Sequence, residues 1–292
     1  MWHWLYIVLA ISLSEGILAQ NGTCGVQVIK PHQHSSTSRV SRIVGGRESI
    51  PHSWPWMVLL RFRTATITCG GSLVRGADGN IVIVTAAHCV DGATNPADWK
   101  ADVGVHSRAS MEPNQKEYGI QEIIQNPGFN FQFLDDDVAI LKTAWPIELN
   151  DYVQPICMTT ENSELKVGQE CVVMGWGADV QGGSPVDRLH EVYKPIIADV
   201  DCGNALSVFG YNNNSMLCAG NLVTGGVDAC SFDSGVPFAC KNTNGQWELV
   251  GISSWGFGCA QPGYPGVYTE VYTFLQWIHD NTHTSVGGPI VG

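Results

Sequence analysis

Three residues of this chain combine side-chain types that can carry out nucleophilic catalysis: Ser234, His88 and Asp137. A serine hydroxyl attacks effectively when an imidazole takes its proton, and a carboxylate can hold that imidazole in the right tautomer. Ser234 lies in a short stretch whose glycine and proline, at positions 235 and 237, favour a turn that presents a side chain. His88 follows an apolar run and adjoins a cysteine that can anchor it, and Asp137 precedes another apolar run.

Two of these residues also have an ordinary structural explanation. A lone histidine in an apolar setting is usually a hydrogen-bonded core residue. An acidic run such as residues 135–137 is usually a solvated loop, which is the role that we assign to Asp135 and Asp136. The catalytic interpretation of His88 and Asp137 therefore depends on the rest of the sequence.

The elements that must position these side chains are expected to be short strands. From residue 43 onward, runs of strand length are separated by Gly, Pro, Asn and Asp. The clearest runs are 56–60, 81–84, 138–141 and 171–174. Asn244-Gly245 lies between two further runs and predicts a hairpin. Helical spacing occurs only near the end, where Phe274, Trp277 and Ile278 share one face, so we predict an all-β fold with a short C-terminal helix.

The first residues of the chain predict export. An apolar run at residues 5–13 is followed by small residues, and Ala19-Gln20 suits signal-peptidase cleavage, so residues 1–19 are interpreted as a signal peptide. The run is shorter than the ~20 residues that a membrane-spanning helix needs, and no later segment is long and apolar enough to anchor the chain. We therefore expect a secreted, extracellular protein without a membrane anchor.

Composition narrows the classes of partner and cofactor. The formal net charge of −12 argues against nucleic acid as a partner, because such binding needs clustered Lys and Arg. Ten cysteines in an exported chain indicate disulfides, and no two of them have the C-x-x-C spacing of zinc or redox motifs. Residues 105–115 lack the paired acids that calcium prefers, so no metal and no cofactor is expected.

Four motifs in a fixed order resemble the trypsin-like serine protease family over roughly residues 43 to 281. They are Ile43-Val44-Gly45-Gly46, Thr85-Ala86-Ala87-His88-Cys89, Asp137-Val138-Ala139-Ile140-Leu141 and Asp233-Ser234-Gly235. The resemblance implies two antiparallel β-barrels with the active site between them. It also implies that Ser234 attacks the scissile carbonyl, that His88 acts as general base and then acid, and that Asp137, hydrogen-bonded by Ser254, orients His88.

The same resemblance implies a zymogen. Cleavage of the Arg42-Ile43 bond would create an amino group on Ile43 that pairs with Asp233 and shapes the oxyanion hole. Residues 20–42 would remain as a tethered light chain, with residues 43–292 as the protease domain. The disulfides that the resemblance implies are Cys24–Cys157, Cys69–Cys89, Cys171–Cys240, Cys202–Cys218 and Cys230–Cys259. The alternative for Arg42 is a surface charge in a polar connector.

The resemblance extends to the substrate pocket. Asp228 matches the family position of the carboxylate at the pocket base, and the walls would be Ser254-Trp255-Gly256 and Gly266-Val267-Tyr268. Together they resemble the Arg/Lys-specific branch, with a faint likeness to acrosin-like members. Partners would be protein or peptide substrates, an activating protease, which could be another copy of the enzyme, and protein inhibitors. Alternatively, Asp228 merely ends the turn at 225–227.

One stretch departs from the family pattern. The usual Gly-Asp-Ser-Gly-Gly-Pro is Phe232-Asp233-Ser234-Gly235-Val236-Pro237 here. The backbone N–H groups of Phe232 and Ser234 would form the oxyanion hole, and the side chain of Phe232 disfavours the conformation that aims its donor. We expect slow or selective turnover and resistance to bulky inhibitors. The alternative is a protease-shaped binding protein with little catalysis, against which the intact His88 and Asp137 argue.

Two asparagines, Asn21 and Asn213, stand in the Asn-x-Ser/Thr pattern of glycosylation acceptors. Such triplets also arise by chance.

Overall fold

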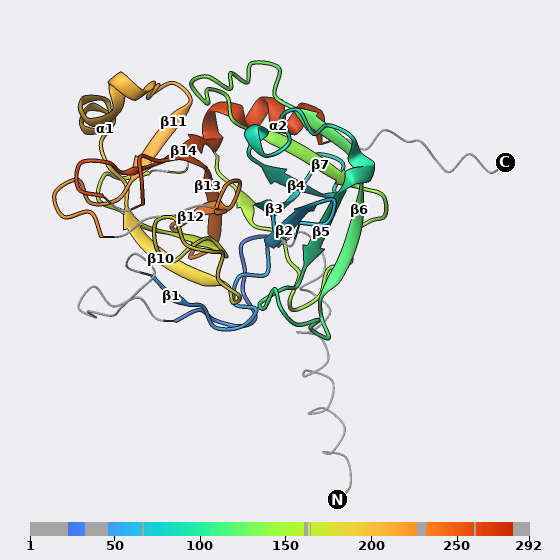
Figure 1. Cartoon of the computed structure of the whole chain (residues 1–292). Coiled ribbons are helices and arrows are strands. Elements are labelled where there is room, and N and C mark those ends of the chain that lie inside the picture. Colours follow the sequence, from blue (N-terminus) through green and yellow to red (C-terminus); the bar gives the residue numbers. More distant parts are fainter. Residues whose placement is uncertain are drawn as a thin grey trace, which may run out of the picture.

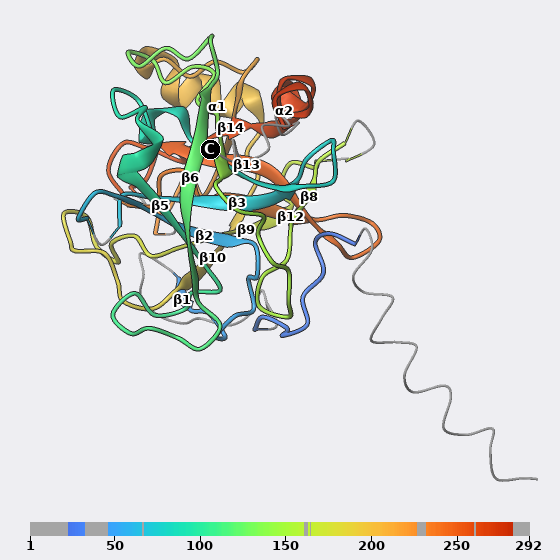
Figure 2. The ribbon, with the colours of Figure 1, turned by 90° about the vertical axis from the view of Figure 1, so that its right-hand side faces the viewer.

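Strands dominate the computed structural model, which describes residues 23–32, 46–65, 67–160, 163, 165–226, 232–259 and 261–282. Figure 1 shows two strand-rich halves side by side, the first coloured blue to green and the second mainly yellow to red, and Figure 2 views the molecule from the side of the first half. The predicted all-β fold with a short C-terminal helix is confirmed.

The first half is a closed antiparallel barrel. Its strands are β2 (Met57–Phe62), β3 (Cys69–Arg75), β4 (Ile81–Thr85), β5 (Trp99–Val103), β6 (Lys116–Gln125) and β7 (Ala139–Thr143), in the order β2-β3-β4-β7-β6-β5. Leu60, Leu73, Ile83 and Ile140 are fully buried, as expected for strands whose apolar residues face a common interior.

The second half is an eight-stranded sheet. It contains β1 (Arg47–Glu48), β8 (Cys157–Met158), β9 (Glu170–Gly175), β10 (His190–Pro195), β11 (Met216–Ala219), β12 (Pro237–Lys241), β13 (Trp247–Trp255) and β14 (Gly266–Glu270). The order is β1-β10-β9-β12-β13-β14-β11, and β8 lies parallel to β13. A bridge between Ile196 and Ala219 brings the end of β10 against β11, so the sheet curves back on itself.

The C-terminal helix α2 (Leu275–Asn281) follows the 3-10 turn η5 (Val271–Phe274). Phe274 and Ile278 are buried in the core, and Trp277 packs partly buried against it. The segment then returns to the first half, where the Ala77 N–H donates to Thr282 Oγ1 at 3.0 Å. The second half therefore ends with an element that also packs on the first.

One helix contradicts the sequence-based expectation that helical structure occurs only near the end. Helix α1 spans Asp199–Leu206 and continues into the 3-10 turn η4 (Ser207–Phe209); two further 3-10 turns are η2 (Ala87–Cys89) and η3 (Pro96–Asp98). Only Cys202 and Leu206 of α1 are buried, so its apolar stripe is too short to detect, and Gly203 lowers its intrinsic propensity. The Cys202–Cys218 disulfide anchors it to β11.

The two halves meet closely at Gly70 in β3 and Val236, the residue before β12. A Cβ atom on Gly70 would lie 2.3 Å from Cγ1 of Val236, which is fully buried. The Gly70 N–H also donates to the Ser234 carbonyl at 2.8 Å. The valine that replaces a family glycine is therefore accommodated because Gly70 has no side chain.

We predict that Gly70→Ala lowers the free energy of unfolding by about 1–3 kcal/mol, because the added methyl group overpacks this contact. In a Val236→Gly background the same substitution should cost clearly less. Urea denaturation of the four proteins of this double-mutant cycle measures the coupling. Additive costs would contradict the proposed contact.

Candidate active site

Strand pairing in the first half brings His88 and Asp137 to the same edge. Strand β4 pairs with β7 through Thr85 and Ala139. His88 lies in η2, three residues after Thr85, and Asp137 lies two residues before Ala139. Because β4 and β7 are antiparallel, the residues that follow β4 lie close to the residues that precede β7.

The Asp137 carboxylate is fully buried and accepts three hydrogen bonds. Its Oδ2 lies 2.7 Å from His88 Nδ1, and its Oδ1 accepts the backbone N–H of His88 at 2.8 Å. The hydroxyl of Ser254, from β13 of the second half, donates to Oδ2 at 2.5 Å. These donors compensate for burial of the carboxylate and hold the imidazole with Nδ1 toward it.

The other ring nitrogen of His88 is left to face away from Asp137. The His88 side chain is 18% exposed, so the imidazole is reachable at the surface. Thr269 in β14 adds a further bond across the two halves, donating its hydroxyl to the Asp137 carbonyl at 2.8 Å.

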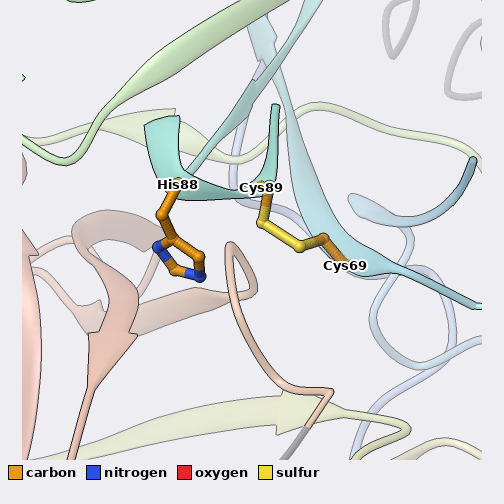
Figure 3. A group of neighbouring side chains, drawn as sticks. All are labelled: Cys69, His88 and Cys89. Carbon is orange, nitrogen blue, oxygen red and sulfur yellow. A yellow bond between two sulfur atoms is a disulfide. The ribbon is translucent and has the colours of Figure 1, made fainter. Parts of the chain in front are cut away.

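A disulfide anchors the turn that carries His88 (Figure 3). The ligand atoms of Cys69, His88 and Cys89 lie within 4.8 Å of one another, a grouping of residue types that could hold a metal. The sulfurs of Cys69 and Cys89 are bonded to each other, however, so neither is available as a thiolate ligand. The trio therefore does not fit a metal, and the disulfide joins η2 to β3.

Ser234 is half-buried and held by its backbone between the two halves. Its carbonyl accepts from the Gly70 N–H, and the Gly235 N–H donates to the Ser253 carbonyl at 2.8 Å. Gly235 has φ +79°, and a Cβ atom there would lie 2.2 Å from Thr85 Oγ1. Only glycine fits this close approach to the end of β4, so the turn carrying Ser234 sits beside the strand that leads to His88.

The side chain of Asp233 points into a cradle of two glycines. It is 8% exposed, and its Oδ1 accepts the Gly177 N–H at 2.8 Å. Cβ atoms on Gly175 and Gly177 would lie 2.0 and 2.2 Å from the carboxylate oxygens. Side chains at these two positions would exclude the Asp233 carboxylate, and nothing in the sequence patterns singled them out.

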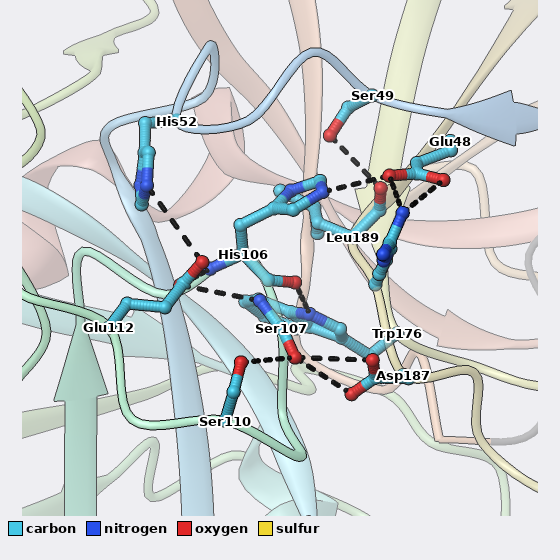
Figure 4. A network of polar contacts seen from close by, with 11 residues as sticks. Glu48, Ser49, His52, His106, Ser107, Ser110, Glu112, Trp176, Asp187 and Leu189 are labelled. Carbon is cyan, nitrogen blue, oxygen red and sulfur yellow. Dashed lines mark hydrogen bonds and ion pairs between the residues drawn. The ribbon is translucent and has the colours of Figure 1, made fainter.

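A polar network supports the segment that carries this cradle (Figure 4). Trp176 Nε1 donates to the His106 carbonyl at 3.0 Å, and His106 Nε2 lies 3.2 Å from Glu48 Oε1 in β1. Arg188 contacts the same oxygen at 3.1 Å. Burial acts to raise the pKa of Glu48, but hydrogen bonds from His106 and Arg188 outweigh it and lower that pKa. The network links β1 to the segments that follow β5 and β9 and to the segment that precedes β10. No local sequence signal identifies it.

Phe232 adopts the left-handed backbone conformation, with φ +75°, and is 39% exposed. That region is natural for glycine and costs other residues roughly 1–2 kcal/mol because the Cβ atom crowds the following carbonyl. The aromatic ring is therefore held at the surface beside Asp233 and Ser234 on a strained backbone.

The walls expected for the substrate pocket come from paired strands. Ser254 and Trp255 end β13, and Gly266 begins β14, with Trp255 opposite Val267. Gly256 directly follows Trp255. Several predicted features lie outside the described residues: the signal peptide at 1–19, Asn21, Arg42, Ile43, Asp228 and Cys230.

The segment 23–32 is attached to the second half. A disulfide joins Cys24 to Cys157, the Gly25 N–H donates to the Pro155 carbonyl, and the Trp247 N–H donates to the Gly25 carbonyl. Trp247 Nε1 also donates to Gln27 Oε1 at 2.8 Å. This segment is therefore held by hydrogen bonds as well as by its disulfide.

Four disulfides join described residues: Cys24–Cys157, Cys69–Cys89, Cys171–Cys240 and Cys202–Cys218. These are four of the five pairs that the family resemblance implies, and Cys259 is disulfide-bonded as well. Asn213 is exposed in the turn before β11. Among the described helices, none combines the length and apolar character needed to span a membrane.

Comparison with known proteins places this geometry in one family. The family model described as Trypsin matches residues 43–278. The chain is 37% identical over 242 residues to transmembrane protease serine 9 of Rattus norvegicus, covering 83% of this chain and 22% of that protein. It is 38% identical over 254 residues to transmembrane protease serine 7 of Mus musculus, covering 84% and 29%. The chain thus spans less than a third of either relative, and by its matched domain it belongs to the trypsin family of serine proteases.

Proposed function

We propose that this protein is a serine endopeptidase in which Ser234 is the nucleophile, His88 the general base and acid, and Asp137 the residue that orients His88. The observation that carries the proposal is the 2.7 Å contact between His88 Nδ1 and the buried Asp137 carboxylate. Because the Nδ1–H group donates a hydrogen bond to Asp137, the imidazole offers Nε2 as the proton acceptor for a serine hydroxyl.

In this mechanism the Ser234 oxygen attacks the scissile carbonyl while His88 Nε2 takes the hydroxyl proton. His88 then passes the proton to the leaving amine, and an acyl group remains on Ser234 until water removes it. The backbone N–H groups of Phe232 and Ser234 stabilise the carbonyl oxygen as it gains negative charge. Asp137 stays ionised and stabilises the imidazolium that forms.

The proposed substrates are proteins or peptides with Arg or Lys before the cleaved bond. Asp228 would supply the carboxylate that attracts the cation, between walls formed by Ser254-Trp255-Gly256 and by Gly266 and its neighbours. This preference rests on the family resemblance of those positions.

We further propose secretion through a signal peptide at residues 1–19 and activation by cleavage at Arg42-Ile43. The glycine cradle supports a role for Asp233 as partner of the new amino group, because it holds the carboxylate inside the molecule beside Ser234. The disulfide between Cys24 and Cys157 would keep residues 20–42 attached after cleavage.

A second candidate function is a protease-shaped binding protein with little catalysis. Phe232 is the observation that favours it, because a strained aromatic residue stands where the family has glycine at an oxyanion donor. The hydrogen-bonded His88–Asp137 pair favours the enzyme.

Active-site titration separates the two functions. Protein cleaved after Arg42 should release about one equivalent of chromophore from an ester substrate in a rapid burst, because the acyl group accumulates on Ser234. Ser234→Ala and His88→Ala should each abolish the burst. The absence of a burst from the cleaved parent protein would favour the binding protein.

Activation should depend on Arg42. The Arg42→Gln zymogen should stay uncut and inactive when incubated with the active enzyme, because no cation remains at the cleavage site. Arg39→Gln is the matched control and should be activated at the parent rate. Electrophoresis after reduction and the appearance of esterase activity report the outcome; normal activation of Arg42→Gln would exclude this cleavage site.

Phe232→Gly should raise kcat, by up to about 10²–10³-fold if Phe232 at present misdirects its oxyanion donor. It should also strengthen inhibition by bulky protein inhibitors, since the exposed ring is removed. The measurements are steady-state kinetics with a small substrate and inhibition constants with a Kunitz-type inhibitor. If kcat and the inhibition constant were both unchanged, Phe232 would limit neither turnover nor inhibitor binding.

A further inference from the structure

A lysine is completely buried in the second half of the molecule. Lys194 lies in β10, has no exposed surface, and is among the largest fully buried side chains. Its Nζ donates to the Tyr268 hydroxyl at 2.8 Å and lies 5.0 Å from the centroid of the Tyr268 ring. Both residues make further interactions. A buried ammonium is expensive unless it is paired or hydrogen-bonded, so its position requires an explanation.

Lys194 reaches the strands that form the proposed substrate pocket. Tyr268 lies in β14 two residues after Gly266, and β14 pairs with the end of β13 through Val267 and Trp255. The end of β10 meets β11 through the bridge between Ile196 and Ala219, and β11 pairs with β14, so the buried Lys194 side chain reaches Tyr268 on the inside of the curved sheet.

Lys194 also adjoins the start of the segment that contains Asp228. Its Cε lies 3.7 Å from the position of a Cβ atom on Gly220, the residue that follows β11. The Gly220 N–H donates to the carbonyl of Pro195, the neighbour of Lys194, at 2.9 Å. The buried cation thus lies where β10, the end of β11 and the start of β14 come together.

The charge of Lys194 matters because solvent does not screen it. Two unit charges separated by several ångströms at an effective dielectric constant near 20 interact strongly enough to change a binding constant by about 10- to 100-fold. A cationic substrate side chain entering between β13 and β14 would be repelled by the Lys194 ammonium, whereas a neutral side chain would not.

We propose that Lys194 determines specificity, since its buried ammonium reduces the selectivity of the substrate pocket for cationic side chains. Neutral polar and apolar side chains then compete with Arg and Lys at the position before the cleaved bond. This inference rests on the proposed function for the location of the pocket, and it modifies the substrate class that Asp228 alone would imply.

Lys194 could instead serve packing alone. Tyr268 stacks on Phe238 with ring centroids 4.4 Å apart, and a hydrogen bond from Lys194 would help to hold that stack. If Lys194 served packing alone, replacing it should change the affinities for charged and neutral ligands equally. If its charge matters, replacing Lys194 should change the affinity for cationic ligands only.

The test compares a cationic probe with a neutral one of the same shape. Benzamidine and benzamide binding would be measured by calorimetry on protein cleaved after Arg42 that carries Ser234→Ala, with and without Lys194→Met. We expect Lys194→Met to bind benzamidine about 10- to 100-fold more tightly and to leave benzamide affinity unchanged. Lys142→Met, which replaces a lysine buried in the first half and paired with Glu122, is the matched control and should change neither.

Benzamidine binding no tighter than in the parent, or equal changes for both probes, would overturn the proposal. Thermal unfolding establishes that each variant is folded. Because binding needs no turnover, the result is separate from the catalytic assignment. With Ser234 intact, the ratio of kcat/KM for Arg over Gln substrates should rise in Lys194→Met. Failure of both proteins to hydrolyse any substrate would reject the proposed function while the binding result still decides the role of Lys194.

Discussion

The buried carboxylate of Asp137 is the group on which the rest of the site depends. Its burial is compensated by the hydrogen-bond donors of His88 and Ser254 that surround it. Those donors come from the two halves of the molecule, and Thr269 adds a bond to the Asp137 backbone from the second half. The requirement to satisfy one buried charge therefore aligns the two halves and sets the direction of the His88 ring at the same time.

Two residues in the stretch from Phe232 to Val236 replace family glycines, and the structure accommodates them in different ways. Val236 fits because the facing residue, Gly70, lacks a side chain, so the added volume is absorbed by packing. Phe232 instead keeps its backbone in the left-handed region despite its Cβ atom. Val236 thus affects the packing between the two halves, whereas Phe232 affects the geometry of a proposed oxyanion donor.

Several charged side chains of the second half lie buried or partly buried near the candidate site without being assigned contact with the substrate. Asp233 lies in a glycine cradle, and the segment carrying that cradle is tied through Trp176 to His106 and Glu48. Lys194 places a cation deep beneath β14. Because low-polarity surroundings strengthen such interactions, groups that never touch a substrate can influence both the shape of the site and the charge that it accepts.

The class of fold, the C-terminal helix and the family could all be inferred from the amino-acid sequence. Apolar periodicity and turn residues are local, so the strands near 57–62, 81–85, 139–143 and 170–175 and the face formed by Phe274 and Ile278 could be predicted. The local motifs around His88, Asp137 and Ser234 likewise predict the candidate site. Helix α1 could not be predicted, because its two buried residues leave too short a pattern and a disulfide to β11 anchors it.

Contacts between residues that are far apart in the chain depend on the folded arrangement of the strands. The pairing of β4 with β7, the approach of Ser254 to Asp137, the fit of Val236 on Gly70 and the burial of Lys194 all depend on strand register between segments far apart in the chain. A lysine in a sequence normally indicates an exposed charge. Its burial here follows from the curvature of a whole sheet, which no local pattern of residues encodes.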